Sequence, residues 1–565
     1  MEKRTIKVSP AVYLLFGLIG VLFWFFCLTE GDLAEQGNII WTKAYTVKSM
    51  VISLVGGCLL GGVVCTLFAW WDIVRKPEDG PGRPGAAPGV RTWKVFAVSL
   101  LLTALAWLPA YLAYYPAICA YDTPTQVGQI VNRLYTDHHP LAHTLLLKLF
   151  MDFGSGALGS VTAGIGIYAF LQMLFLAASL ACGVALLHRR GLGWGPLILM
   201  QLLCMFYPFH WYMGITVTKD TVFTAFFVLL MLAFYELLRE SDDKARRLRG
   251  GIGFLFAAAG VILFRNNGKY AFLILLILLV PVFLFSKRSR RCCRRIILWS
   301  VGGLLLGSLL LNAVFRLSGA QQGDRREILS VPIQQLARTM LYHGGVDVLP
   351  EDDNTMDEAD KALIDAFILN EGYKKYRPSI ADPVKQQTYT HAALYRAKEF
   401  VSTYLGLFLR YPGDYLNAAL AMNAGYLYPN DESHAYINVT DQRVGRGYIQ
   451  TCWEEEYLNE QGIYKESGWN RLYEKLERWA DANAYLKLPI LKYFFVPGVW
   501  IWLYLVLLAR LVMLKRYKQC IPLALVGGYF LTLLLGPGVQ MRYIYPLMTA
   551  FPFILILSVD CGKCC

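Results

Sequence analysis

The sequence predicts an all-α polytopic membrane protein with about 12 transmembrane helices and a mainly helical extracytoplasmic domain. Three observations predict this class. First, 56% of the 565 residues are hydrophobic and 17% are charged, which is too apolar for a soluble protein of this length. Second, the apolar residues form runs of roughly 20, the length that a helix needs to cross a bilayer. Third, the basic residues behind the net charge of +13 gather in loops between these runs, which indicates membrane topology and argues against a nucleic-acid partner.

Twelve apolar runs are long enough to be spans, some of them only marginally. The first follows a basic N-terminus, and because no small-residue cleavage site comes after it, we expect a retained helix and not a signal peptide. The spans are predicted at residues 9–28, 49–71, 95–116, 160–187, 195–212, 221–238, 251–264, 270–286, 296–316, 493–513, 519–536 and 543–559.

Lys and Arg in short loops predict the orientation, because cytoplasmic loops retain positive charge. Placing the N-terminus in the cytoplasm puts every strongly basic loop on that side. We therefore expect a multi-pass cell-membrane protein with both termini cytoplasmic and the long segment 317–490 extracytoplasmic. This segment has 18 Lys and Arg against 25 Asp and Glu, a charge of 18 − 25 = −7, opposite in sign to the whole chain.

These boundaries divide the chain into five parts. They are two N-terminal transmembrane helices (1–79), a Pro/Gly-rich cytoplasmic linker (80–92), a transmembrane core with its first outer loop at 117–159 (93–316), the extracytoplasmic domain (317–490), and the last spans with a short cytoplasmic tail (491–565).

Four groups of polar residues fall on the same predicted outer face. Ionisable residues at a bilayer boundary are costly and are usually functional or paired, so we take these groups as candidate site residues. They are Asp122 with His138, His139 and His143 after the third span, Lys219 and Asp220, Arg265 with Asn266 and Asn267, and Arg542.

Each group also has a purely structural interpretation. Asp122 precedes Pro124 and could cap a helix, as an alternative to being a catalytic carboxylate. Lys219 and Asp220 could satisfy each other at a helix start.

Arg265 could extend its side chain from a helix end into the membrane interface, and Arg542 could be an interfacial anchor, although guanidinium groups also suit bidentate phosphate binding. His139 and His143 have the i, i+4 spacing of a zinc site, but a third ligand and a glutamate are missing. Hydrogen bonding to a substrate, or a structural role at the membrane interface, is therefore favoured over a metal.

Together these residues resemble a known family. The sequence is similar to the GT-C superfamily of integral-membrane glycosyltransferases, and more narrowly to a bacterial branch found mainly in Gram-positive organisms. The resemblance extends from Trp93 to Pro552 and rests on the motifs YDTPTQ, HHP-x-x-H-T-L-L, TKD, RNNG, SVPIQQLAR, YPGDYL and RYIYPL.

The resemblance implies transfer of a sugar from a polyprenyl-phosphate carrier to an envelope glycopolymer, lipid or protein on the outer face. It makes Asp122 the catalytic group and Lys219, Arg265 and Arg542 the ligands of the donor phosphate. The first outer loop has one Asp where several members have paired acids, so a divalent cation is left open as a cofactor. Substrate positioning is then expected of Tyr121, His138, His139, His143, Asp220, Asn266 and Asn267.

Two other functions compete with this one. A transporter or lipid flippase would show charges in mid-span and broken helices, yet the spans carry few charges. A scaffold for envelope assembly gives no reason for acidic, basic and His residues to meet at one membrane face. Glycosyl transfer is therefore the function that the sequence favours.

Overall fold

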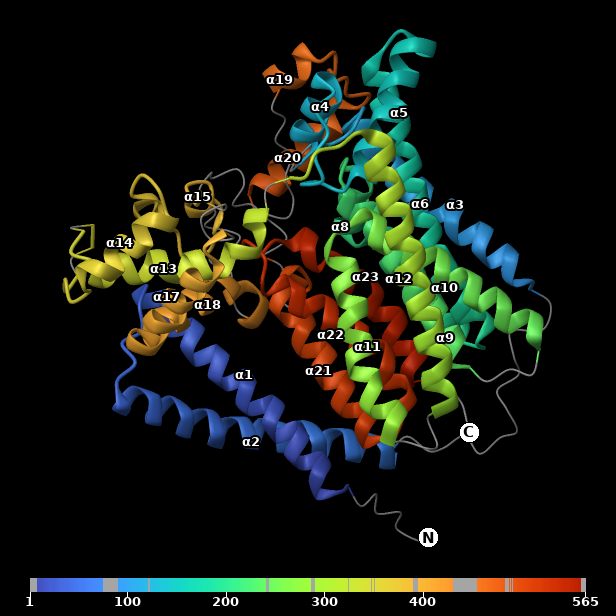
Figure 1. Cartoon of the computed structure of the whole chain (residues 1–565). Coiled ribbons are helices and arrows are strands. Elements are labelled where there is room, and N and C mark those ends of the chain that lie inside the picture. Colours follow the sequence, from blue (N-terminus) through green and yellow to red (C-terminus); the bar gives the residue numbers. More distant parts are fainter. Residues whose placement is uncertain are drawn as a thin grey trace, which may run out of the picture.

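The computed structural model describes residues 8–74, 90–119, 122–239, 243–285, 290–323, 325–346, 348–349, 351–389, 395–429, 455–482, 487, 489 and 491–559. These residues form helices and no strand, and the chain is an all-α polytopic membrane protein (Figure 1). The predicted linker 80–92 falls largely outside the described residues, as does the end of the predicted cytoplasmic tail.

All twelve predicted spans coincide with helices. Eight described helices are long and apolar enough to cross a membrane, and a ninth span results if α7 and α8, which meet at 47°, are counted as one. The eight are α1 (Pro10–Gln36), α2 (Lys43–Val74), α3 (Thr92–Ala113), α6 (Val161–Arg189), α9 (Lys219–Leu238), α10 (Lys244–Phe264), α12 (Arg290–Ser318) and α23 (Met541–Val559).

The remaining predicted spans are shorter helices. Pro208 separates the two members of the bent pair, because proline lacks the N–H that a continuing helix needs. These helices are α7 (Trp194–Phe206), α8 (Pro208–Ile215), α11 (Asn267–Phe285), α21 (Pro497–Met513) and α22 (Ile521–Leu533).

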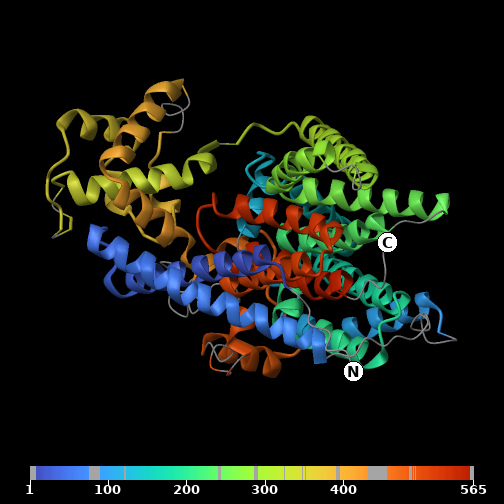
Figure 2. The same ribbon diagram turned by 90° about the horizontal axis from the view of Figure 1, so that it is seen from below.

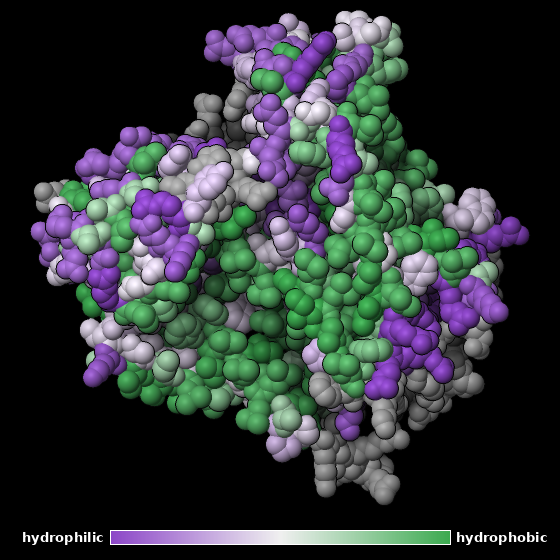
Figure 3. All heavy atoms as spheres, in the orientation of Figure 1, coloured by the Kyte–Doolittle hydropathy of each residue, from purple (hydrophilic) through white to green (hydrophobic). Residues whose placement is uncertain are grey.

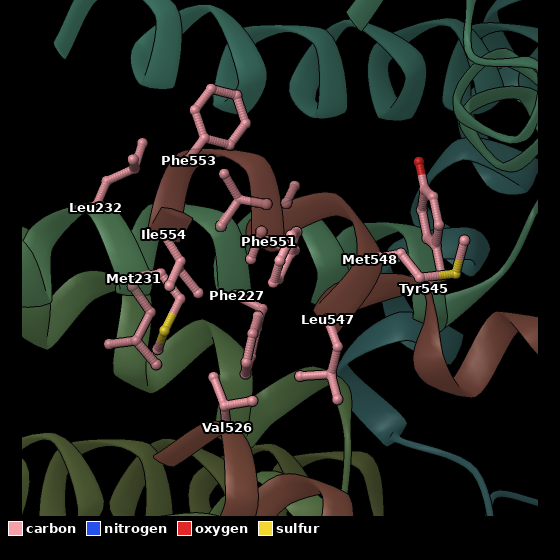
Figure 4. Close-up of a cluster of buried hydrophobic side chains, with 14 of the residues drawn as sticks. Phe227, Met231, Leu232, Val526, Tyr545, Leu547, Met548, Phe551, Phe553 and Ile554 are labelled. Atoms are coloured by element: carbon pink, nitrogen blue, oxygen red, sulfur yellow. The ribbon is translucent and has the colours of Figure 1, made fainter. Parts of the chain in front are cut away.

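A dense apolar core joins α9, α22 and α23 (Figure 4). Phe227 of α9 and Leu547 of α23 are almost fully buried, and Val526 of α22 packs in the same cluster. Because interiors are close-packed, this core fixes α9 against α23 and so holds their N-terminal ends together.

The predicted extracytoplasmic segment lies in two places (Figures 1 and 2). One part forms a separate core beside the bundle, here called the side domain, and the other packs over the ends of the bundle helices near α3 and α4 (Thr123–Asn132). The side domain contains η1 (Arg325–Leu329), α13 (Ser330–His343), α14 (Glu358–Phe367), η2 (Gly372–Lys375), α15 (Asp382–Lys385), α17 (Ala397–Arg410) and α18 (Pro412–Leu427).

The second part contains α19 (Glu455–Glu460) and α20 (Asn470–Asp481). Leu458 of α19 is buried in the core that α4 shares with α5 (Leu141–Leu158), and Tyr473 of α20 packs edge-on against Tyr114 after α3. The last spans follow the short helix η4 (Leu491–Phe495), and η5 (Tyr517–Cys520) joins α21 to α22.

The two ends of the bundle differ in charge. Arg189 and Arg190 at the end of α6 contact Glu236 near the end of α9, and α10 and α12 both begin with basic residues at this end. The opposite end carries the beginnings of α9 and α23 and the turn between α10 and α11. Figure 3 shows a hydrophobic band on the bundle between hydrophilic regions, which is the surface expected of a protein in a lipid bilayer.

Candidate functional site

Two extended segments bring the first candidate motif to the second. Ile118 pairs with Thr216 in a parallel bridge, and the amide of Val217 donates to the carbonyl of Ile118 at 2.9 Å. The Thr123 hydroxyl donates to the carbonyl of Val217. The beginnings of α4 and α9 therefore lie side by side, although they are far apart in the sequence.

The predicted polar residues meet there in one group of ion pairs. Lys219 Nζ lies 2.6 Å from Asp122 Oδ2, and Arg542 Nη1 lies 3.1 Å from the same oxygen. Arg542 Nη1 is also 3.5 Å from Asp220 Oδ2, and Arg265 Nη1 is 2.5 Å from Asp220 Oδ1. The polar network is defined as Asp122, His139, Lys219, Asp220, Arg265 and Arg542.

Accessibility changes across the polar network. The Asp220 side chain is fully buried and that of Arg542 is 6% exposed, whereas Asp122 is 20% and Lys219 is 14% exposed. Asp122 and Lys219 are therefore more accessible than Asp220 and Arg542. Asp220 contacts both Arg265 and Arg542 and so links the two guanidinium groups.

Sequence reasoning missed the residues that surround the two arginines. Arg265 lies over the rings of Tyr543, Phe223 and Tyr529 at 4.6, 5.6 and 5.7 Å, and cation–π contacts of this kind stabilise a desolvated guanidinium. Gln540 Oε1 accepts from Arg542 Nε at 2.6 Å. Gln540 and Tyr543 could have been suspected because they flank Arg542 in the sequence.

The charges of the polar network set the protonation of Asp122 and His139. Burial alone would raise the pKa of the Asp122 carboxyl, but the positive charges of Arg542 and Lys219 hold that pKa well below its ordinary value. Burial and the charge of Lys219 lower the pKa of His139 to about 3. At neutral pH Asp122 is therefore an anion and His139 is neutral.

The structure decides between several of the alternatives. Asp122 occupies the N-cap position of α4, but its side chain makes no capping hydrogen bond. Lys219 bonds to Asp122 and Asp220 bonds to the two arginines, so these neighbours pair with other residues and not with each other. Arg265 and Arg542 are both buried, so neither is a side chain that reaches out to the membrane interface.

The histidines separate into three environments. His139 Nδ1 lies 3.2 Å from Lys219 Nζ, which places it in the polar network. His143 is fully buried and bonds to Gln126 at 2.9 Å and to Tyr168 at 2.8 Å, so it joins α4, α5 and α6. His138 is exposed.

Two of the three remaining candidates lie outside the polar network. Asn266 is exposed and Asn267, the first residue of α11, is half-buried. Tyr121 lies outside the described residues. Substrate positioning by these three residues stays a prediction.

A divalent cation does not fit this arrangement. Among the described residues there is no group of three or more His, Cys, Asp and Glu side chains that could hold a metal. Both carboxylates of the polar network already contact cationic side chains. These cationic side chains would repel a divalent metal ion.

Comparison with known proteins finds one family. The chain matches a family of unknown function, DUF6020, over residues 131–561. The chain belongs to this family. The DUF6020 match includes His139, Lys219, Asp220, Arg265 and Arg542, whereas Asp122 lies just before it. No curated protein and no solved structure matches the chain.

The buried pair of Arg265 and Asp220 should dominate the stability of this DUF6020 site. Arg265→Met leaves the Asp220 carboxylate without its closest cation, and breaking a buried pair in this way costs about 3–5 kcal/mol. We expect a large fall in the melting temperature of the purified protein. Arg291→Met, the same change at an exposed arginine of α12, should have little effect.

A double variant tests the cause of that loss. Asp220→Asn removes the stranded charge, so Arg265→Met with Asp220→Asn should melt above Arg265→Met alone. If the fall in melting temperature of the double variant equals the sum of the falls of the two single variants, the two side chains are not coupled and the explanation is wrong.

Proposed function

We propose that this protein is a membrane glycosyltransferase that moves a sugar from a polyprenyl-phosphate-linked donor to a cell-envelope acceptor. The resemblance of its motifs to the GT-C superfamily supports a sugar as the transferred group and a lipid as its carrier. The polar network supports binding of the carrier's phosphate and a catalytic role for a carboxylate. Glycopolymers, lipids and proteins of the envelope are the acceptors we consider.

The observation that carries the proposal is the unequal charge of the polar network. It contains three cations, Lys219, Arg265 and Arg542, and two carboxylates, Asp122 and Asp220, a balance of 3 − 2 = +1 with His139 neutral. A buried surplus of positive charge favours an anionic ligand. The N-terminal ends of α4, α9 and α23 meet at the same place and add to the positive potential.

In the proposed reaction Asp122 is the base. The acceptor hydroxyl attacks the anomeric carbon of the donor sugar, the bond from that carbon to the carrier's phosphate oxygen breaks, and the phosphate leaves with the bonding electron pair. Asp122 takes the hydroxyl proton, while Lys219 and Arg542 stabilise the charge that develops on the phosphate.

The same cations couple donor binding to the strength of the base. In the ligand-free protein Lys219 and Arg542 lower the pKa of Asp122, so it is a weak proton acceptor. A bound phosphate shares both cations and raises the pKa of Asp122. The carboxylate becomes a better base when the donor is in place.

A transporter remains the second candidate, because one observation favours it. The bent pair of α7 and α8 resembles the broken spans of transporters. These two helices contain no Asp, Glu, Lys or Arg, however, and the polar network lies at helix ends. This distribution of charge suits an enzyme at the membrane boundary better than a solute site in mid-span.

Replacing the catalytic carboxylate should abolish sugar transfer. In vesicles that contain the purified protein, a lipid-linked sugar donor and envelope acceptors, Asp122→Asn should lower product formation by about 10²–10⁴-fold, the usual contribution of a general base. The control is Asp152→Asn, the same change at a carboxylate of α5 that is 60% exposed, which should keep full activity.

Binding of polyprenyl phosphate is a second measurement, which distinguishes a variant that has lost catalysis from one that has failed to fold. Asp122→Asn releases Lys219 and Arg542 from their carboxylate, so it should bind polyprenyl phosphate at least as tightly as the original protein does. Full transfer activity in Asp122→Asn would rule out the assignment of Asp122. Passage of the donor lipid across the vesicle membrane without sugar transfer would support the transporter.

The proposed reaction also requires the polar network to face outward. We propose cytoplasmic termini and an extracytoplasmic side domain, because the basic loops lie at the end of the bundle opposite the polar network. In intact cells a membrane-impermeant amine reagent should label Lys374, which is exposed in the side domain, and should label the exposed Lys515 only after lysis. Labelling of Lys515 first would reverse the orientation.

A further inference from the structure

Helix α17 of the side domain has two apolar faces. One face carries Phe400 and Leu407, which are buried in the side-domain core. The other exposes Val401 (51%), Leu405 (51%) and Leu409 (77%), which recur with the spacing of one helix face. A soluble domain normally keeps such a face polar.

The exposed face is an extended stripe and not an isolated residue. Phe408 is 44% exposed beside Leu409, and Leu416 at the start of α18 is 39% exposed. Single exposed apolar residues are ordinary, but contiguous ones mark a surface that meets another apolar phase. The lipid-facing stripe is defined as Val401, Leu405, Phe408 and Leu409.

Contacts with the turn between the first two spans indicate where this stripe lies relative to the membrane. The Trp41 indole lies in the turn between α1 and α2 and donates to Asn417 Oδ1 of α18 at 2.7 Å. A Cβ placed on Gly413, at the corner between α17 and α18, would lie 3.1 Å from the Trp41 ring. Because α1 and α2 are each long and apolar enough to cross a membrane, we infer that the turn between them lies at the membrane boundary.

The surroundings of Trp41 are those of a membrane interface. Trp41 packs edge-on against Tyr45 at 5.5 Å, and Trp and Tyr concentrate where acyl chains meet headgroups. Ile40 (74%) and Val47 (61%) of the same region are exposed apolar residues. In Figure 3 hydrophobic surface at the lower left extends up to the side domain.

A basic residue lies beside the stripe. Arg396 pairs with Glu399, and Arg410 pairs with Asp357 and Asp360. Lys398 is exposed and is one helical turn from Val401 on the same side of α17. Basic residues beside an apolar helix face are typical of helices that lie on anionic membranes.

We propose that α17 is an in-plane membrane helix whose lipid-facing stripe lies in the headgroup and acyl boundary of the leaflet reached by the turn between α1 and α2. The side domain is then held to the bilayer at two places, by the contacts with that turn and by α17 itself. This proposal does not depend on the reaction, and it holds for either orientation of the chain.

The test uses the full-length chain in vesicles of phosphatidylglycerol and phosphatidylethanolamine. The photoreactive residue benzoyl-phenylalanine replaces Leu409, and in the matched control it replaces Leu369, which lies between α14 and α15 and is 40% exposed. Illumination should add phospholipid to the peptide with position 409 about tenfold more than to the control, because only the former lies in the apolar phase.

A second measurement needs no variant. A phospholipid with a diazirine in its acyl chain should label the original protein between residues 401 and 409 and leave the peptide with Leu369 unlabelled. Crosslinks from position 409 to a second copy of the chain or to another protein would overturn the proposal. Equal labelling of the two peptides, or none at 401–409, would overturn it as well.

Discussion

The two ion pairs of the Asp122 carboxylate are the contacts on which the rest of the site depends. Lys219 comes from the first turn of α9 and Arg542 from the first turn of α23, so one carboxylate ties two spans to the segment that follows α3. Charges at a membrane boundary are costly unless they are paired. A packing that moved the beginnings of α9 and α23 apart would leave several of these charges without partners.

The core below the polar network and the aromatic rings beside it protect this geometry. Close packing of Phe227 and Leu547 fixes α9 against α23, and the rings of Tyr529 and Tyr543 exclude water from Arg265. The network is therefore rigid at its buried side and accessible at Asp122. A preorganised positive site of this kind can bind a phosphate with little reorganisation, and that is the physical basis of the proposed function.

The sequence predicted the elements well and the contacts in part. Hydrophobic runs locate the spans because a bilayer requires long apolar helices. The distribution of Lys and Arg among the loops predicted one common face for five residues, Asp122, Lys219, Asp220, Arg265 and Arg542. The sequence could not show that the His143 side chain points into the core, because the partners of His143, Gln126 and Tyr168, come from other helices.

Two further features depend on tertiary packing alone. Nothing local distinguishes Phe223 among the 31 Phe residues of the chain, or Tyr529 among its 34 Tyr residues. The composition of segment 317–490 predicts one domain, yet its helices pack against two different parts of the molecule. Burial of Leu458 and packing of Tyr473 against Tyr114 hold α19 and α20 on the bundle.

The central claim is that the surplus cation of the polar network binds the phosphate of a lipid carrier. The most direct measurement compares polyprenyl monophosphate with the uncharged polyprenol by native mass spectrometry of the purified protein. We expect the phosphate to be retained and the alcohol to be lost, and we expect Lys219→Met to weaken retention of the phosphate by roughly tenfold, the effect of losing one charge-assisted hydrogen bond. Equal retention of the two lipids, or retention of the phosphate that Lys219→Met leaves unchanged, would contradict the claim.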